Sequence, residues 1–155
     1  ARPIGFLIAE EYYDLPILGH IIKVVDCVPV RRGQNDIGAF KAALRHLHEG
    51  KPLGVFPAGR IPAPGEGIEY HDGAVALALR AGAPVIPVHV SGTHYEDSIA
   101  RAFFRRHKAR VRFGAPIDLS QYGREVDKQT MREITRMLMA KVAELGERPS
   151  VPAKP

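Results

Sequence analysis

Residues 53–62 read LGVFPAGRIP. The apolar run over residues 53–56 is typical of a buried strand, and Pro57 ends it because proline has no N–H for a strand ladder. A loop rich in proline and glycine follows over residues 57–67, and a short Ala-rich helix is predicted over residues 73–80 and closed by Gly82. A strand, a loop and a helix in this order are typical of folds in which helices cover a parallel sheet.

The sequence before this unit predicts the same alternation. Short apolar runs over residues 4–8 and 27–30 are typical of strands, and Asp14 is predicted to cap a helix between them. A second helix is predicted to begin at Asn35 or Asp36, both good capping residues. Its expected apolar stripe is Ile37, Phe40, Leu44 and Leu47.

Beyond the unit, the run PVIPVHV (84–90) is continuously apolar, which predicts a central strand covered on both faces. Residues 109–113 (ARVRF) alternate in the manner of a half-exposed edge strand. Asp127 is predicted to cap a long helix that ends at Gly146. The second half of the chain therefore adds further strands and a final helix.

With 155 residues, 45% hydrophobic and 25% charged, the chain is long enough for one compact domain. We expect an α/β fold, a single layered domain with a mostly parallel central sheet flanked by helices, over residues 1–146. Residues 147–155 are predicted to be a mobile Pro-rich tail. The single cysteine, Cys27, excludes an internal disulfide, suits a reducing compartment and is interpreted as a buried structural thiol.

The chain is basic, with a formal net charge of +5, and much of the excess lies in residues 101–112, RAFFRRHKARVR. Such a stretch suits the phosphates of lipid headgroups, phosphorylated cofactors or nucleic acid. A solvated basic face without a partner is an equally open interpretation.

Other arginines follow two predicted strands directly. Arg31 and Arg32 follow residues 27–30, and Arg60 follows residues 53–56 within three residues of Pro57. Ligands of parallel sheets bind at the carboxyl ends of the strands, and arginine can make two charge-assisted hydrogen bonds to one phosphate. With Gly33 and Gly59 allowing close backbone approach, these two loops predict a phosphate site.

The sequence lacks the residues that several other kinds of active site require. No G-x-S-x-G motif and no Walker-type loop occurs. His46 and His48 lie two apart on a predicted helix and point to different faces, so no metal site is predicted. Ser91, His94 and Asp97 are interpreted as polar loop residues rather than as a catalytic triad.

Four sequence blocks together resemble one enzyme family. PILGHIIKVVDCVPVRRG (16–33), GVFPAGRI (54–61), DGAVALALRAGAPVIPVHVSG (72–92) and RVRFGAPIDLSQY (110–122) occur in the order and spacing of the glycerophospholipid (lysophosphatidic acid) acyltransferase family. The corresponding family blocks run roughly IPVDRG, FPEGTRS, VIPVxxxG and RFGEPIDLSEY.

The resemblance implies transfer of a fatty acyl group from acyl-CoA or acyl-carrier protein to a lysophospholipid such as 1-acylglycerol 3-phosphate. It implies no bound cofactor, and a His-x-x-x-x-Asp pair as the catalytic centre. Arg32 is implied to bind the acceptor phosphate, and the block GVFPAGRI (54–61) is implied to line the headgroup site. The implied binding residues are Arg32, Gly33, Phe56, Pro57, Ala58, Gly59 and Arg60.

Two departures from the family pattern stand out. None of the seven histidines has an aspartate five residues on, so the catalytic pair is expected upstream of Ala1 and the chain alone is expected to be inactive. Ala58 replaces the glutamate of FPEG, and Arg31 replaces the aspartate of VDRG. Both changes predict a more cationic site than the family has, with an altered headgroup preference.

Three interpretations stay open at this point. The first is a lysophospholipid acyltransferase, and the second is a non-catalytic relative that binds phospholipid or acyl carrier. The third, nucleic-acid binding through Phe103, Phe104 and their arginines, has no supporting motif. For the first two we expect peripheral membrane association on the cytoplasmic side. An amphipathic face of Tyr12, Tyr13, Leu15, Leu18 and Ile22 would serve this purpose, unless these residues pack into the core.

Overall fold

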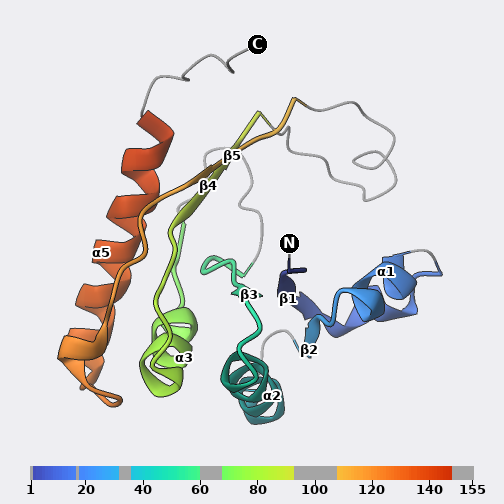
Figure 1. Cartoon of the computed structure of the whole chain (residues 1–155), viewed down its shortest axis with the longest axis horizontal. Coiled ribbons are helices and arrows are strands. Elements are labelled where there is room, and N and C mark those ends of the chain that lie inside the picture. Colours follow the sequence, from blue (N-terminus) through green and yellow to red (C-terminus); the bar gives the residue numbers. More distant parts are fainter. Residues whose placement is uncertain (1, 17, 32–35, 60–67, 93–107, 148–155) are drawn as a thin grey trace.

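A computed structural model describes residues 2–16, 18–31, 36–59, 68–92 and 108–147 (Figure 1). The elements in chain order are β1 (Gly5–Ala9), the 3-10 helix η1 (Glu10–Asp14), α1 (Leu18–Val24), β2 (Val28–Val30), α2 (Ile37–His48), β3 (Leu53–Gly54), α3 (Gly73–Ala81), β4 (Val88–Ser91), β5 (Arg110–Phe113), the 3-10 helix η2 (Ser120–Tyr122) and α5 (Lys128–Glu147). Helix α5 thus ends one residue beyond the predicted Gly146.

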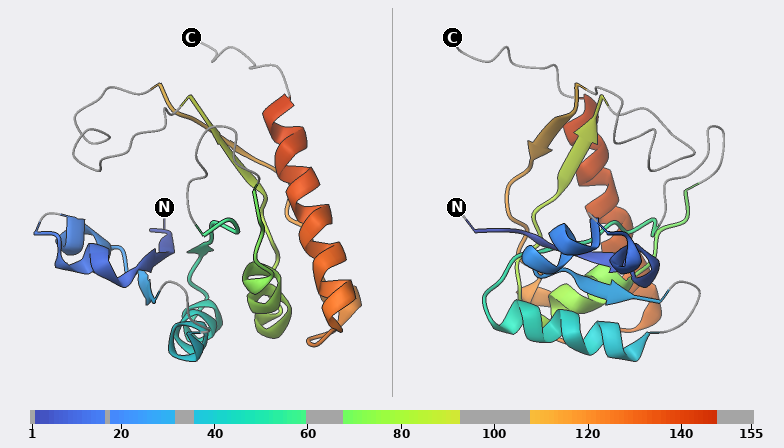
Figure 2. Two further views of the ribbon diagram at one scale, coloured as in Figure 1. Left: turned by 180° about the vertical axis from the view of Figure 1, so that it is seen from behind. Right: turned by 90° about the vertical axis from the view of Figure 1, so that its right-hand side faces the viewer.

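A parallel sheet forms the first half of the fold. Its strand order is β2-β1-β3, and β1 pairs in parallel with both neighbours. Helices α2, α3 and α5 stand in a row, and α1 lies at the far end of the molecule from α5 (Figures 1 and 2). The predicted α/β fold with a mostly parallel sheet flanked by helices is confirmed.

Strand β3 is shorter than predicted. It covers two residues, and Val55 and Phe56 lie outside the ladder. The Phe56 ring stacks instead on Phe6 of β1, with ring centroids 5.9 Å apart. A close approach at Gly54, where a side chain would collide with the Phe6 ring, accommodates this aromatic pair.

The predicted central strand over residues 84–90 is wrong in position and in pairing. Val85 makes an isolated bridge to Ile117, and the ladder of β4 begins only after Pro87, which has no N–H to contribute. β4 then pairs antiparallel with β5. The sequence did carry this signal, because the rule that ends the first strand at Pro57 also interrupts the run at Pro87.

The β4–β5 ribbon has one covered face and one bare face. Arg112 donates hydrogen bonds to the Leu145 and Gly146 carbonyls of α5 (3.0 and 3.2 Å), and the His89 ring packs against Gly146. The opposite face carries the cross-strand pairs Val88–Phe113 and Val90–Val111. All four of these side chains are exposed.

Four capping predictions have definite outcomes. The Asp36 carboxylate accepts the Ala39 N–H of α2 at 2.9 Å, and Gly82 ends α3 in a left-handed conformation with φ 62°. The Asp127 carboxylate accepts the N–H groups of Gln129 and Thr130. Asp14, by contrast, is the last residue of η1. Its predicted capping role is wrong because the chain makes an additional 3-10 turn before α1.

Helix α2 buries a different stripe from the predicted one. Ala39, Ala43 and His46 are buried, whereas Ile37 is 66% exposed. Small side chains allow the helix backbone to approach its neighbours closely, and this close packing decides the buried face. The main hydrophobic core lies elsewhere, between α3 and α5, and consists of Val75, Ala78, Leu79, Leu119, Ile134 and Leu138.

None of the helices in the described parts of the chain is long and apolar enough to cross a membrane.

Gly5 is a packing constraint that can be tested. A Cβ added to Gly5 would lie 2.6 Å from the Asp26 carbonyl oxygen and 2.9 Å from the His46 ring. We expect Gly5→Ala to lower the free energy of unfolding by about 1–3 kcal/mol in urea titrations. Gly73→Ala is the matched control, because nothing lies within 4 Å of its added Cβ. Equal stability of the two variants would contradict this account.

Candidate functional site

Three chain segments leave the same edge of the parallel sheet. Because β1, β2 and β3 run in parallel, their carboxyl ends lie together, and ligands of such sheets bind there. Glu10 follows β1, Arg31 follows β2, and the turn Pro57–Gly59 follows shortly after β3. β1 lies between the other two strands, so its exit occupies the middle of this edge.

An ion pair joins the exits of β1 and β2. The pairing of Ala9 with Val30 places the next residues, Glu10 and Arg31, side by side. Nε of Arg31 donates to Oε2 of Glu10 at 2.9 Å, and both side chains are more than half exposed. The hydrogen bond and charge of Glu10 raise the pKa of Arg31. Glu10 therefore compensates the charge of Arg31, while the prediction of a more cationic site stays a prediction because Arg32 and Arg60 lie outside the described residues.

The start of α2 is occupied by a carboxylate of the protein itself. Asp36 accepts hydrogen bonds from Ala39 N–H (2.9 Å) and Arg31 N–H (3.0 Å). These backbone bonds are the main reason that the pKa of Asp36 is lowered. A phosphate at this position would meet the negative charge of Asp36, which already accepts the Ala39 amide of α2.

The turn after β3 is tied to the start of α3. Gly59 N–H donates to the Phe56 carbonyl at 2.9 Å, and Gly59 adopts the left-handed φ of 65° that glycine tolerates best. His71 N–H donates to the Pro57 carbonyl at 2.9 Å. Ala58, the residue that replaces the family glutamate, is partly buried in this turn. One hydrogen bond within the turn and one from the segment before α3 thus fix its conformation.

Several predicted site residues lie outside the described residues. These are Arg32, Gly33 and Arg60, together with His94, Asp97 and residues 101–107 of the basic stretch. Phe56, Pro57, Ala58 and Gly59 are described and lie together beyond β3. Their role in headgroup binding stays a prediction.

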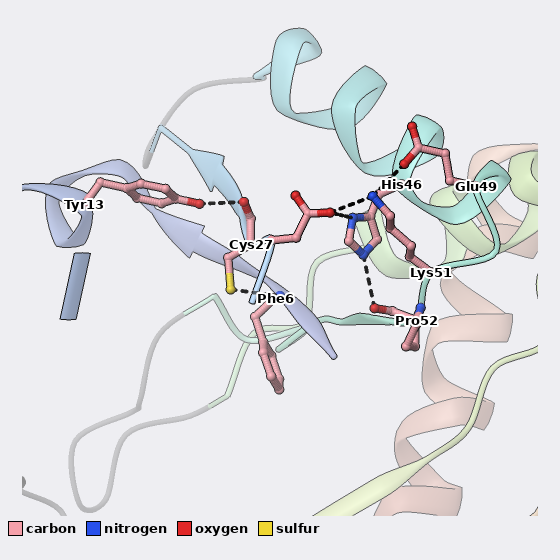
Figure 3. Close-up of polar contacts among 8 residues, drawn as sticks. Phe6, Tyr13, Cys27, His46, Glu49, Lys51 and Pro52 are labelled. Carbon is pink, nitrogen blue, oxygen red and sulfur yellow. Dashed lines mark hydrogen bonds and ion pairs between the residues drawn. The ribbon is translucent and has the colours of Figure 1, made fainter. Parts of the chain in front are cut away.

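A histidine–aspartate pair occurs at the other end of the sheet (Figure 3). His46 Nδ1 lies 3.7 Å from Oδ2 of Asp26, and His46 Nε2 lies 3.2 Å from the Pro52 carbonyl. The ring is 6% exposed. Because both ring nitrogens face protein atoms, this histidine has no nitrogen free to remove a proton from a substrate. The pair joins α2 to the turn before β2, the Pro52 contact joins α2 to the start of β3, and both are structural.

The same cluster contains a bridging lysine (Figure 3). Lys51 Nζ lies 2.7 Å from both Asp26 and Glu49. The hydrogen bond from Lys51 is the largest cause of the lowered pKa of Asp26, and the charge of Lys51 adds to it. No group of three or more potential metal ligands occurs among the described residues.

Cys27 is half-buried, and hydrogen bonds surround it. Phe6 N–H donates to its Sγ at 3.4 Å, and the Tyr13 hydroxyl donates to its carbonyl at 2.6 Å. Burial, followed by the charges of Cys27 and Asp26, raises the pKa of Tyr13 to about 12. The contacts agree with the interpretation of Cys27 as a structural thiol.

Glu10 is the site residue that the sequence analysis missed. It is the first polar residue after the apolar run over residues 4–9. The rule that singled out Arg31 after β2 would have singled out Glu10 after β1. What the sequence could not supply was the register that brings the two together.

The chain matches the family described as Acyltransferase over residues 1–91. It is 24% identical over 142 residues to 1-acyl-sn-glycerol-3-phosphate acyltransferase of Bacillus subtilis, covering 92% of this chain and 68% of that protein. It is 33% identical over 91 residues to lyso-ornithine lipid O-acyltransferase of Pseudomonas aeruginosa, covering 57% of this chain and 35% of that protein.

A solved structure has the same fold. The 1-acyl-sn-glycerophosphate acyltransferase PlsC of Thermotoga maritima superposes with a TM-score of 0.64 at 21% identity, over 95% of this chain. The chain spans 58% of the length of that protein.

The Asp26–Lys51 contact predicts a pH dependence. A lowered pKa of Asp26 stabilises the fold above about pH 3.9, the ordinary value of aspartate, and this stability is lost as the pH falls through the folded pKa. We expect Lys51→Met to lower the urea midpoint at pH 7 and to lose this effect near pH 2. Lys41→Met, an exposed control, should match the wild type at both pH values. If Lys51→Met lowers the urea midpoint by the same amount at pH 2 as at pH 7, the Asp26–Lys51 contact is not the source of the pH dependence.

Proposed function

Because the chain belongs to the acyltransferase family, we propose that the full-length protein transfers a fatty acyl group to a lysophospholipid in phospholipid biosynthesis. The donor is acyl-CoA or acyl-carrier protein, and the acceptor is a lysolipid of the 1-acylglycerol 3-phosphate type. The observation that carries this proposal is the family match over residues 1–91, which includes all three strand exits at the candidate site.

The names of the two relatives restrict the class of acceptor. One acts on 1-acyl-sn-glycerol 3-phosphate and the other on a lyso-ornithine lipid, by their names. Both acceptors are lipids with one free hydroxyl for an incoming acyl group. The shared class, a lysolipid, is therefore better supported than either headgroup.

In this reaction the acceptor hydroxyl loses its proton to a general base and its oxygen attacks the thioester carbonyl. Donated hydrogen bonds stabilise the resulting oxyanion, and the thiolate then leaves. We propose from the resemblance that the base is a histidine oriented by an aspartate, in a segment upstream of Ala1. The residues at the carboxyl edge of the parallel sheet bind the headgroup and hold the acceptor hydroxyl toward that base.

We also propose peripheral contact with the membrane that holds the acceptor, on its cytoplasmic side. The amphipathic face suggested by the sequence needs correction, because Ile22 is 2% exposed and Tyr13 donates its hydroxyl proton inward to Cys27. The apolar side chains that α1 does expose are Ile21 (47%) and Val24 (69%). These two replace the earlier residues as the proposed lipid contact.

The transfer is tested with the full-length gene product, acyl-CoA or acyl-carrier protein, and lysophosphatidate. We expect acyl transfer, and we expect Ala58→Glu to change kcat/KM among acceptors several-fold, because it returns a carboxylate to the turn after β3. No transfer with either donor, together with tight lysolipid binding, would favour the non-catalytic relative instead. An unchanged acceptor profile would limit the turn to a structural role.

The membrane contact is tested by co-sedimentation with vesicles that contain anionic lipid. We expect Ile21→Asp with Val24→Asp to weaken binding about tenfold, since two apolar side chains would no longer enter the lipid. Ile37→Asp is the control, because Ile37 is 66% exposed, close to the value of Val24, but belongs to α2. Equal loss in the control would rule out α1 as the contact surface.

A further inference from the structure

The apolar side chains of the β4–β5 ribbon lie on the face opposite to α5. We call this surface the apolar ribbon face, and it consists of Val88, Val90, Val111 and Phe113. These four side chains are 36–63% exposed.

The polar side chains of the ribbon lie on the face that is covered. The cross-strand pair His89–Arg112 is turned toward α5, and Arg112 donates to the last carbonyls of that helix. An antiparallel pair with one face in water normally has its polar side chains on the wet face and its apolar ones on the covered face. The ribbon has the reverse arrangement, which indicates that the apolar ribbon face is built to be covered as well.

The apolar ribbon face is turned toward the half of the fold that contains the parallel sheet. Figures 1 and 2 place the ribbon between α5 and β1. Since α5 packs on one face, the other face looks toward β1 rather than away from the molecule. Among the described elements, β4 and β5 contact chiefly each other and α5. The missing cover must therefore come from outside the described part of the chain.

The positions of the two chain ends indicate which segment can supply this cover. In Figure 1 the N-terminus lies beside β1, on the side of the ribbon away from α5. Residues upstream of Ala1 therefore start on the side to which the apolar ribbon face is turned. At the other end, Glu147 is the last residue of α5, the helix on the covered face. The chain spans 58% of the solved structure with the same fold, so that protein has further chain to pack around this fold.

We propose that the segment upstream of Ala1 packs an apolar stretch on the apolar ribbon face in the full-length protein. The removal of four large apolar side chains from water is the driving force for this docking. The inference goes beyond the proposed function, because it depends neither on the acceptor nor on the acyl donor. It makes the ribbon an anchor for the same segment in which the base of the acyl transfer is proposed.

A photo-crosslinker at position 113 tests which partner covers the face. In the full-length protein, Phe113→p-benzoylphenylalanine keeps an aromatic ring at the position and reacts on irradiation with whatever touches it. We expect intramolecular cross-links to peptides upstream of Ala1, identified by mass spectrometry. Ile37→p-benzoylphenylalanine is the matched control, because Ile37 is 66% exposed on α2, and it should give no cross-link to those peptides.

Four outcomes of this experiment would overturn the proposal. Cross-links that join two copies on a denaturing gel would assign the face to a second copy of the chain. Cross-links that form only to the lipid of added vesicles would assign it to the membrane. Cross-links confined to residues 1–155, or a gene product with no residues upstream of Ala1, would leave the segment without a role there.

Cysteine labelling measures the burial of the face independently. In full-length protein with Cys27→Ser, which removes the native thiol, Val111→Cys and Ile37→Cys each introduce one thiol. We expect a maleimide to label the Val111→Cys variant about tenfold more slowly than the Ile37→Cys variant in the folded protein, and equally fast in urea. Equal rates in the folded protein would overturn the proposal. Neither measurement requires acyl transfer, so a failure of the proposed function is seen separately.

Discussion

The parallel pairing of β1 with β2 and β3 is the constraint on which the rest of the structure depends. It aligns three strand ends at one edge, and the close approach of Gly5 to Asp26 and His46 fixes β1 in the centre. A parallel sheet of this kind has chemically different edges, because all strands enter at one side and leave at the other. The two edges of this sheet accordingly present different chemical groups.

The entry edge is closed by polar contacts. His46, Asp26 and Lys51 satisfy one another and the Pro52 carbonyl, so their hydrogen-bonding groups are used for folding (Figure 3). The exit edge instead presents exposed charges and a fixed turn, with Glu10 and Arg31 at its middle. The histidine–aspartate pair thus serves the fold, because the His46 ring is buried and both of its nitrogens face protein atoms. The arginine–glutamate pair is exposed at the candidate site.

The second half of the fold has a comparable asymmetry. Helix α5 covers one face of the β4–β5 ribbon and accepts hydrogen bonds from Arg112, whereas Val88, Val90, Val111 and Phe113 are exposed on the other face. A contiguous exposed apolar face is typical of an interaction surface. The prediction that the run before Ser91 is a central strand covered on both faces is therefore wrong, because Val88 and Val90 lie on the exposed face of a two-stranded ribbon.

The sequence by itself determined the alternation of strands and helices, the caps at Asp36, Gly82 and Asp127, and the family, because these depend on local patterns and on blocks in a fixed order. It could not determine the buried stripe of α2, the shortness of β3 or the antiparallel partner of β4, which depend on packing between distant segments. It also identified Arg31 but not Glu10. Only the tertiary structure decided that these charges meet, because the register of β1 on β2 brings together residues that are 21 positions apart.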